Sequence, residues 1–389
     1  MGEVELGVVA PMRLMVLDGS YAHSVSIATE LVEDLGATII GVGTLGRPAL
    51  HRSRFCHIHE TAPDPQEPSY IDHIIDIAQR RNAAAIVPVG FFSHAALVLA
   101  ADRVLGITRA VMPDPDGFSV ASDKRTTYEV ARKVGVRVPN DLTVAVTSAL
   151  AQGTDPRVTY PLIVKTRYEA GGSTTAIVPT PHSLANAIDT LRKRHPELIF
   201  QEYIEGGPST YAYCGYFCEG EARIDFQHHE VLSVPRHGGS GVRVNTYQDR
   251  EVAELGRRLL LELRWNGVAQ VEFKRSQTGE LILMEINPKF WASYALASRT
   301  GHRIATTAVA DALDLSPAAV RTRKPRCGRM VFPVRELAHT LRQGSLPGVL
   351  RSALAMAWPL ASMDVRLDDL AAYLPSRPRR SRPPRSHDA

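Results

Sequence analysis

The feature that most constrains the fold of this chain is a predicted β-hairpin of largely apolar strands. Its two strands are Val271–Lys274 and Leu281–Asn287, and the turn between them contains Thr278–Gly279. A small polar residue followed by glycine, between two apolar runs, is typical of a hairpin turn. A two-residue loop and a four-residue loop give the same register, in which Glu272 lies directly opposite Glu285. The hairpin therefore places two carboxylates side by side.

This acidic pair needs a partner that offsets its charge. Carboxylates that face each other across two strands repel, and apolar neighbours make their burial costly. Asn287 follows Glu285 by two residues, so its amide extends the same face of the strand. Such oxygen ligands suit Mg²⁺, which binds one or two carboxylates and fills its shell with waters and substrate phosphates. The sequence predicts Glu272, Glu285 and Asn287 as magnesium ligands, and the alternative is a solvent-facing hairpin.

The N-terminal part of the chain alternates between predicted strands and helices. Short apolar strands at residues 13–17, 37–42 and 84–89 are separated by helical segments, which is typical of a small parallel α/β domain. In such a sheet, ligands bind beside the loops that follow the carboxyl ends of the strands. The loops Asp18–His23 and Gly90–His94 lie there. We expect these two loops to face the active cleft and to hold a substrate.

A lysine and a glycine-rich turn form a candidate phosphate site. Lys165 ends an apolar strand, and Gly171, Gly172 and Ser173 follow it closely. Glycines allow backbone N–H groups to approach phosphate oxygens. The segment is not a P-loop, because the chain has no G-x-x-x-x-G-K-[ST] and a strand follows this turn. The alternative interpretation is an ordinary hairpin turn beside a lysine.

Two further segments are candidates for nucleotide contacts. Lys124 lies in the first turn of a helix capped by Ser122 or Asp123, where the helix dipole disfavours a cation and an anionic partner would be favourable. An exposed lysine paired with Asp123 is the alternative. The second segment ends a predicted strand and is either an adenine-binding hinge or an edge strand. It consists of Gln201, Glu202, Tyr203 and Ile204.

Composition narrows the classes of function. The chain has 389 residues, 44% hydrophobic and 22% charged, as in an ordinary soluble globular protein. No apolar run reaches the ~18 residues that a membrane helix needs, and no basic segment followed by an apolar one opens the chain. Four scattered cysteines predict no disulfide framework. We therefore expect a cytoplasmic protein without a membrane partner.

Positive charge is concentrated at the C-terminus. The formal net charge is +4, and the stretch Pro375–Ala389 accounts for it with five arginines and one acid. We interpret residues 373–389 as a disordered Arg/Pro-rich tail, and its contact with nucleic acid or anionic lipid is the alternative. The rest of the chain is near neutral, so we expect no nucleic-acid partner for the folded part.

Other catalytic classes fit the sequence less well. Cys214, Cys218 and His228–His229 lie on neighbouring predicted strands, but their spacing matches no common zinc pattern. A serine hydrolase needs a G-x-S-x-G turn, which Gly238–Gly241 does not provide. A dinucleotide-binding G-x-G-x-x-G is missing after the first strand. None of these three interpretations is favoured.

Taken in order, five motifs resemble those of the ATP-grasp superfamily. They are Asp123–Lys124, Pro161–Lys165 with Gly171–Gly172, Gln201–Ile204, Val271–Lys274 and Glu285–Pro288. The run Glu285–Ser293 is especially similar to a bacterial group of ATP-grasp carboxylate–amine ligases, also described as predicted carboligases. The resemblance spans about residues 110–310, and the residues before it look like a pre-ATP-grasp domain.

The resemblance implies a fold of mixed α/β and α+β type. A pre-ATP-grasp Rossmann-like domain would precede a two-subdomain ATP-grasp fold. The expected division is a pre-ATP-grasp domain at 1–110, a small subdomain at 111–200, a large subdomain with the metal site at 201–317, a helical extension at 318–372 and the tail.

The resemblance also implies cofactors and a reaction. Lys124, Lys165 and the loop Gly171–Ser173 would contact the phosphates of ATP, and the segment Gln201–Ile204 would line the adenine site. The acidic hairpin would hold one or two Mg²⁺. A substrate carboxylate would be phosphorylated by ATP, and an amine would attack the acyl phosphate to form an amide. The alternatives are a kinase, a ligase with a non-amine nucleophile and a non-catalytic ATP-binding protein.

The chain departs from its relatives near the expected acyl phosphate. Lys289 stands where relatives usually carry arginine, so the charge is kept but the bidentate fork is lost. We expect Arg236 or Arg243 to supply the oxyanion donor. The implied partners are a small-molecule carboxylate and an amine, with amino acids among the candidates. Many relatives are dimers, so the resemblance allows a homodimer, although no interface is readable.

Overall fold

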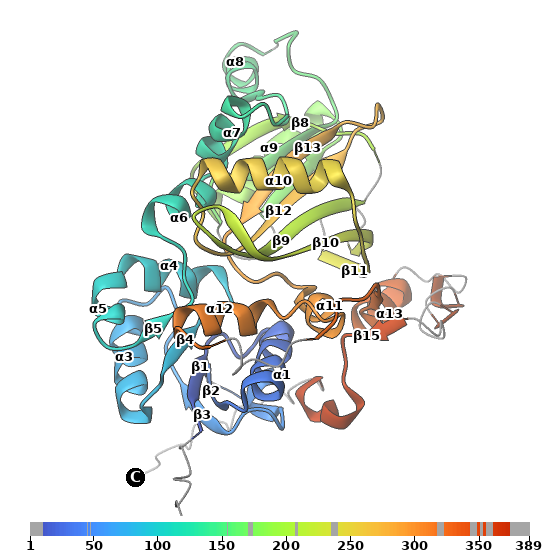
Figure 1. Cartoon of the computed structure of the whole chain (residues 1–389). Coiled ribbons are helices and arrows are strands. Elements are labelled where there is room, and N and C mark those ends of the chain that lie inside the picture. Colours follow the sequence, from blue (N-terminus) through green and yellow to red (C-terminus); the bar gives the residue numbers. More distant parts are fainter. Residues whose placement is uncertain are drawn as a thin grey trace, which may run out of the picture.

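The structure of the chain is a computed structural model. It describes residues 11–44, 46, 48–153, 155–169, 174–206, 209–234, 240–316, 323–342, 348–350, 353–354 and 361–373. Within these residues the chain forms three β-sheets, of five, seven and three strands, with helices packed on and between them (Figure 1). No helix in this part of the chain is both long and apolar enough to cross a membrane.

The N-terminal sheet is parallel, as the alternating pattern predicts. Its strand order is β3-β2-β1-β4-β5, with β1 (Arg13–Val16), β2 (Thr38–Gly43), β3 (Ile58–Thr61), β4 (Ala85–Val87) and β5 (Arg109–Ala110). The connecting helices are α1 (Ala22–Leu35), α2 (Ala49–Arg52), α3 (Tyr70–Arg81), α4 (Phe91–Leu99) and α5 (Ala101–Leu105). The first helix ends at Gly36, whose φ of 62° is a left-handed cap that glycine adopts without steric cost. The small parallel α/β domain that the alternating pattern predicts is therefore present.

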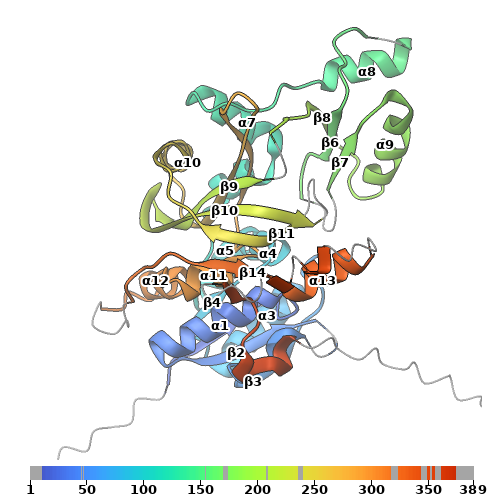
Figure 2. The same cartoon turned by 90° about the vertical axis from the view of Figure 1, so that its right-hand side faces the viewer.

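A small antiparallel sheet forms the far end of the molecule, together with α8 and α9 (Figure 2). Its strand order is β7-β6-β8, with β6 (Leu162–Thr166), β7 (Thr175–Val178) and β8 (Leu198–Glu202). The helices α8 (Thr143–Gln152) and α9 (Leu184–Arg192) bury a separate apolar cluster against it. The helices α6 (Pro115–Ser122) and α7 (Lys124–Lys133) connect this region to the N-terminal sheet.

The seven-stranded sheet lies between the other two. Its order is β13-β12-β9-β10-β11-β14-β15, with β9 (Thr210–Cys218), β10 (Glu221–Val234), β11 (Ser240–Thr246), β12 (Gly267–Arg275), β13 (Leu281–Asn287), β14 (Arg329–Val331) and β15 (Ala361–Met363). Helix α10 (Arg250–Glu262) covers one face, and α11 (Tyr294–Arg299) and α12 (Ile304–Ala312) lie between the other face and the N-terminal sheet (Figure 1).

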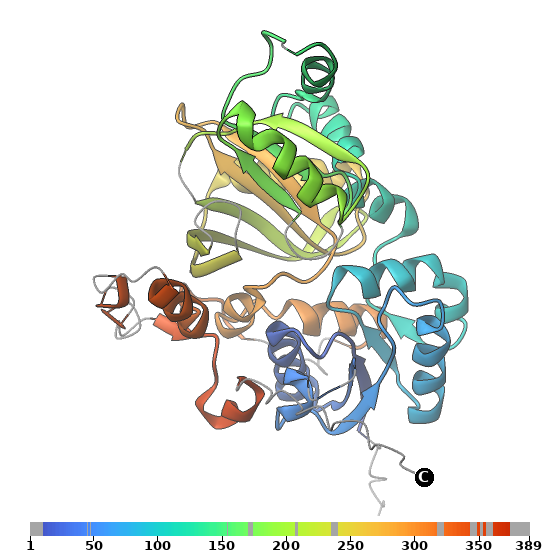
Figure 3. The same ribbon diagram turned by 180° about the vertical axis from the view of Figure 1, so that it is seen from behind.

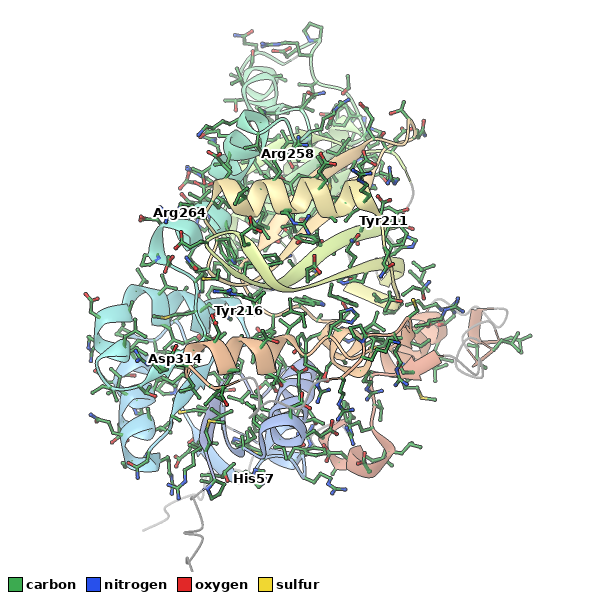
Figure 4. All side chains as sticks on the ribbon, viewed as in Figure 1. His57, Tyr211, Tyr216, Arg258, Arg264 and Asp314 are labelled. Carbon is green, nitrogen blue, oxygen red and sulfur yellow. The ribbon has the colours of Figure 1, made fainter. Side chains whose placement is uncertain are left out.

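Alternation along the strands divides the core in two. Tyr213 and Phe217 of β9 pack toward α10, and Ala212 and Cys214 of the same strand point to the opposite side. The apolar cluster on this opposite side continues through α11 and α12 to α1, the first helix of the N-terminal region. Tyr216 lies between β9 and α12, where its hydroxyl donates to Asp311 at 2.6 Å (Figure 4). The two regions are therefore joined by a continuous apolar core.

The prediction of a helical C-terminal extension is only partly right. Strand β14 pairs with β11, and β15 adds a further parallel strand. A helical remainder consists of α13 (Pro333–Arg342) and the 3-10 turn η3 (Leu367–Tyr373). The turn binds back to the N-terminal region, where Ser53 Oγ donates to Asp369 at 2.6 Å, and Figure 3 shows the red C-terminal segment beside the blue N-terminal sheet. Strands of three residues are too short to show alternation in the sequence. The tail from residue 374 lies outside the described residues.

Candidate active site

The two acids of the hairpin lie opposite one another as predicted, but the strand register between them and the turn differs from the prediction. Glu272 pairs with Glu285, while nearer the turn Lys274 pairs with Ile282, which is one residue out of the expected register. The loop is the three residues 277–279, not the two or four predicted, since Ser276 N donates to Glu280 O at 2.9 Å across it. A bulge next to Glu272 restores the register. The predicted turn is therefore wrong, and the predicted pairing of the two acids is confirmed.

The bulge leaves the Met284 carbonyl available to a neighbouring helix. The hydroxyl of Tyr128, on α7, donates to Met284 O at 2.7 Å. Beside it, Leu283 N donates to Arg137 O at 2.8 Å. These two bonds fix the acidic hairpin to the segment that carries Lys124.

A row of amide and carboxylate side chains lies on the cleft face of the hairpin. Asn287 Nδ2 donates to Glu285 Oε1 at 3.1 Å and to Gln270 Oε1 at 3.3 Å. The sequence interpretation missed Gln270, although it precedes Glu272 by two residues and therefore shares its face. Glu272, Glu285 and Asn287 are all partly exposed, and Glu285 and Asn287 line a cleft.

The two acids differ in how their charge is balanced. Burial and the neighbouring Glu285 and Glu230 raise the pKa of Glu272 well above that of an ordinary glutamate. Burial also acts on Glu285, but the charges of Lys124 and Lys165 hold the pKa of Glu285 below its usual range. One carboxylate is therefore neutralised by lysines, and the other lacks a sufficient counter-charge.

Both predicted phosphate lysines are buried beside this face. Lys124 is 7% exposed and Lys165 is 9% exposed. Burial lowers the pKa of Lys124 despite the nearby Glu285. Burial has the same effect on Lys165, but Tyr128 and the acidic pair raise its pKa above the usual value. Two buried ammonium groups near two carboxylates form a site suited to an anion bound with a cation.

The alternative for Lys124, an exposed lysine paired with Asp123, is wrong. Asp123 caps α7 by accepting a hydrogen bond from Arg125 N at 2.9 Å. Its two carboxylate oxygens also bind Arg167, with Nη2 at 2.5 Å from Oδ2. The acid therefore has its own cation, and Lys124 is directed into the site.

The cleft is completed by the N-terminal region. Its lining comprises Lys124, Tyr128, Glu169, Glu285, Asn287 and Phe91, among others. Phe91 begins α4 and stacks on Phe118 of α6, with ring centroids 5.4 Å apart. The loop at Gly90–His94 thus reaches the cleft as expected. Its role in holding a substrate remains a prediction.

The candidate adenine segment is fixed by backbone contacts. Lys274 Nζ donates to Ile204 O at 2.6 Å and lies 4.9 Å from the Tyr203 ring centroid. Gln201 is buried and 3.4 Å from the Tyr128 hydroxyl. The Glu202 carboxylate binds Asn140 Nδ2 at 2.7 Å, so its side chain is engaged elsewhere. The role of this segment as an adenine site stays a prediction.

The residues expected to stabilise the acyl phosphate differ in their positions. The guanidinium of Arg243 binds Glu336 of α13 with Nε 3.0 Å from Oε1. Its neighbours Val242 and Val244 point toward the cleft-side core, so Arg243 points the other way. Its expected role is therefore not supported. Lys289 is close enough to affect both acids of the pair. Arg236 and the loop Gly171, Gly172 and Ser173 lie outside the described residues.

A third acid, missed in the sequence, belongs to the same face. Burial raises the pKa of Glu230 on β10 to about 7. A Cβ at Gly241 would meet the Glu230 carboxyl carbon at 2.5 Å, so glycine there makes room for this side chain. His228, two residues earlier, lies with Nδ1 3.7 Å from Cys214 Sγ and Nε2 3.4 Å from Gln270 Nε2. Alternation along β10 was the available signal for both residues.

The donor set fits magnesium that is bound together with a phosphate. Its ligands would be carboxylate and amide oxygens, which are hard donors. Among the described residues, no three His, Cys, Asp or Glu side chains are grouped to hold a metal. An ion here would therefore need waters or phosphate oxygens as well, which is how Mg²⁺ is usually bound.

Comparison with known proteins gives consistent likenesses. A family model described as an ATP-grasp domain matches residues 121–293. A putative D-alanine–D-lactate ligase of Streptomyces coelicolor is 24% identical over 189 residues, which are 45% of this chain and 54% of that protein. The chain thus spans about half the length of this curated relative.

Solved structures show the same fold at low sequence identity. Biotin carboxylase from Campylobacter jejuni has a TM-score of 0.63 at 15% identity, covering 81% of this chain and 74% of that one. The biotin carboxylase domain of Hydrogenobacter thermophilus 2-oxoglutarate carboxylase, a dimer in complex with MgADP and bicarbonate, has a TM-score of 0.62 at 15% identity, covering 82% and 74%.

Proposed function

We propose that this chain is an ATP- and Mg²⁺-dependent carboxylate–amine ligase, because residues 121–293 match a family model described as an ATP-grasp domain. A carboxylate oxygen of the substrate attacks the terminal phosphorus of ATP, giving an acyl phosphate and ADP. The amine nitrogen then attacks the acyl carbon, phosphate leaves and the nitrogen loses a proton. The product is an amide.

One observation carries this proposal. Two buried lysines, Lys124 and Lys165, act on the cross-strand carboxylate pair of Glu272 and Glu285. Lys124 and Glu285 line the same cleft. Phosphoryl transfer depends mainly on positioning and on neutralising charge, and less on covalent groups of the protein. A site that combines buried ammonium groups with paired acids supplies both of these requirements.

Each residue has a defined part in this proposal. Lys124 and Lys165 bind phosphate oxygens, and the backbone at Ile204 positions the adenine base. Glu272, Glu285 and Asn287 would hold Mg²⁺, which would supply charge neutralisation for the phosphates. Lys289 acts on both acids of the pair and on His23 and His94 of the N-terminal loops, and its charge would stabilise the acyl phosphate. The low exposure of both phosphate lysines limits the access of water to this intermediate.

A ligase that uses a hydroxyl nucleophile is the second candidate. One specific observation favours it, since the curated relative from Streptomyces coelicolor is named for D-lactate, which carries a hydroxyl where alanine carries an amine. The product would then be an ester. The charge arrangement of the cleft is the same for both nucleophiles.

The reaction class is tested by incubation with ATP, Mg²⁺ and a panel of carboxylates with amines or hydroxy acids. Amide product with equimolar ADP and phosphate supports the amine ligase, and ester product supports the second candidate. A phosphorylated product without either bond would contradict both, as would a complete absence of ADP release across the panel.

The site itself is tested by the double variant Glu285→Gln with Asn287→Ala. We expect Mg²⁺-dependent ADP release to fall by about a hundredfold or more, because the ion loses a carboxylate and an amide ligand. The control Glu280→Gln changes an exposed acid of the same hairpin that pairs with Arg137. Unchanged ADP release in the double variant would contradict the metal site.

The proposal includes the cellular compartment and the oligomeric state of the protein. All four cysteines are free, which supports work in the reducing cytoplasm. The dimer of the Hydrogenobacter thermophilus domain supports a homodimer, which sedimentation of the full chain tests.

A further inference from the structure

A second cavity, of about 210 Å³, lies at the carboxyl edge of the N-terminal sheet. Its walls come from the loops after β1, β2, β3 and β4 and from the start of α3. Strands β1 and β4 are neighbours in the sheet, although the chain forms β2 and β3 between them. Such a reversal of strand order is where ligands bind in open α/β sheets.

Asp18 is held in this cavity by an unusual backbone and three hydrogen bonds. Its φ of 55° is in the left-handed region, which is uncommon for residues other than glycine. Its Oδ2 accepts hydrogen bonds from Val89 N at 3.0 Å, Gly90 N at 2.7 Å and Ser93 Oγ at 2.5 Å. The other oxygen, Oδ1, has no hydrogen-bond partner among the described residues. The carboxylate is therefore fixed in place with one oxygen left for a ligand.

Tyr70 gives a second, independent indication of a ligand. The side chain is only 3% exposed and lines the cavity. Its hydroxyl has no hydrogen-bond partner among the described residues and is not one of their fully enclosed unpaired polar atoms, so it is accessible from the cavity. Burial and the charges of Asp18 and Asp64 raise the pKa of Tyr70 well above the usual value, so the hydroxyl stays neutral and lies near both acids.

The described lining of the cavity favours a cation. It contains the carboxylates of Asp18 and Asp64 and no lysine, arginine or histidine. Tyr21 and Phe92 add aromatic surface, and the remaining wall is mostly apolar. Aromatic faces and carboxylates together attract an ammonium group. The volume suits a small molecule of a few heavy atoms beyond that group.

The cavity is next to the catalytic cleft. Phe91 lines the cleft and Phe92 lines the cavity, and their rings meet edge to face with centroids 5.5 Å apart. Glu169, which lines the cleft, also acts on Tyr21 of the cavity. A molecule held in the cavity can therefore present its other end to the cleft.

We propose that this cavity binds the ammonium group of one substrate, between Asp18 and Asp64 with the Tyr70 hydroxyl as hydrogen-bond acceptor. This assignment rests on the proposed ligase function and names the chemical class of a substrate. The bound ammonium is a recognition group and not the nucleophile, because flanking carboxylates favour the protonated amine, which has no lone pair. The reacting group is a second group of the same molecule, either a carboxylate or another amine.

Equilibrium binding tests the cavity without any turnover. Isothermal titration of the full chain, without ATP, uses matched probes: alanine against lactate, 4-aminobutyrate against butyrate, and 1,4-diaminobutane against butane-1,4-diol. We expect at least one ammonium probe to bind about tenfold more tightly than its partner, since a hydrogen bond to a charged group stabilises more than a neutral one. If no ammonium probe is preferred over its partner, the proposal is wrong.

Two variants locate the binding. Tyr70→Phe removes only the hydroxyl and Asp64→Asn only the charge, and each should weaken the preferred probe by about tenfold. The matched controls are Tyr216→Phe, whose hydroxyl binds Asp311, and Asp72→Asn, an exposed acid on α3 paired with Arg103. Equal binding in the cavity variants and in the controls would overturn the proposal, provided that near-ultraviolet circular dichroism shows all four to be folded.

Turnover then distinguishes the two sources of the ammonium group. With Mg²⁺ and ATP, ADP release driven by an amino acid probe alone assigns the cavity to the carboxylate substrate. ADP release that requires the diamine together with a separate carboxylate assigns it to the amine substrate. Binding without ADP release would count against the ligase function and leave the cavity assignment standing.

Discussion

The two faces of the seven-stranded sheet are built from the same strands and serve different purposes. On β12, Val271 and Phe273 point toward α10 and are completely buried in an apolar cluster. Gln270 and Glu272, which alternate with them, lie on the opposite face, across from Asn287 and Glu285, and these two partners line the cleft. The apolar face supplies burial, the main favourable term in folding. The cleft face carries charges that the sheet itself does not neutralise.

The cations that balance the cleft face come from outside this sheet. Lys124 begins α7 and Lys165 belongs to the three-stranded sheet. Both act on Glu285, whose pKa is lowered by them although burial raises it. The charge balance of the cleft face therefore depends on where the neighbouring elements place their lysines. The α10 face, in contrast, is stabilised by apolar packing alone.

The largest effect should follow a cavity on the apolar face. Phe273→Ala should lower the free energy of unfolding by about 3–5 kcal/mol, because a large buried ring is lost and the gap is only partly refilled. Urea denaturation measures this. The control Val231→Ala changes a residue of β10 that is 40% exposed and should cost about 0.5 kcal/mol or less. Similar losses in both variants would contradict the division into two faces.

On the cleft face, Glu272→Gln should affect function and spare the fold. Mg²⁺-dependent ADP release should fall by about a hundredfold, which is about 2.7 kcal/mol in activation free energy. The same variant should unfold at an unchanged or higher temperature in Mg²⁺-free buffer near neutral pH. A stability loss as large as that of Phe273→Ala would show that the acid is a structural residue.

The pH dependence of the same variant gives a sharper comparison. The pKa of Glu272 is raised in the folded protein by burial, Glu285 and Glu230, so the folded state binds the proton more tightly than the unfolded state. Stability must then fall as the pH rises from the ordinary glutamate pKa toward the raised one. Without Mg²⁺, the melting temperature of the native chain should therefore decrease relative to Glu272→Gln across this window. A difference that is independent of pH would refute the raised pKa.

The smallest effect should appear at the contact between the hairpin and α7. Tyr128→Phe removes the hydroxyl that donates to Met284 O and should cost about 0.5–1.5 kcal/mol of unfolding free energy. We also expect a modest increase in the KM for ATP, because Tyr128 lines the cleft. Thermal denaturation and initial rates measure the two quantities. Tyr216→Phe, with its hydroxyl on the far side of β9 from α10, is the matched control for the loss of a tyrosine hydroxyl, and a KM change of the same size there would contradict a local role.

Part of the site could be predicted because strand alternation is a local rule. Glu285 and Asn287 share a face by their spacing alone, and Gln270 could have been found in the same way. The face of the sheet on which Arg243 lies could not be predicted. It depends on a register shift in β10 and on the partner Glu336, which comes from a helix far along the chain. Asp64 and Tyr70 are likewise brought beside Asp18 only by the packing of separate loops, which no local pattern encodes.

The fold was predictable where elements are long and periodic. The parallel N-terminal sheet and the helix capped by Asp123 follow from repeated apolar spacing and from end signals. Strands β14 and β15 were missed because three residues carry no period. The partner of β14 is the edge of β11, and the partner of β15 is β14 itself.

The bulge beside Glu272 has a consequence for comparing this hairpin with others. It absorbs one residue between the loop and the acids, so the loop length and the position of Glu285 are independent of each other. In an alignment with a relative whose hairpin lacks the bulge, the gap belongs at Met284, even when the loops differ in sequence. A gap placed in the loop instead would leave Glu272 and Glu285 in their columns and would shift only the strand residues between the loop and Met284, Leu281–Leu283, by one position.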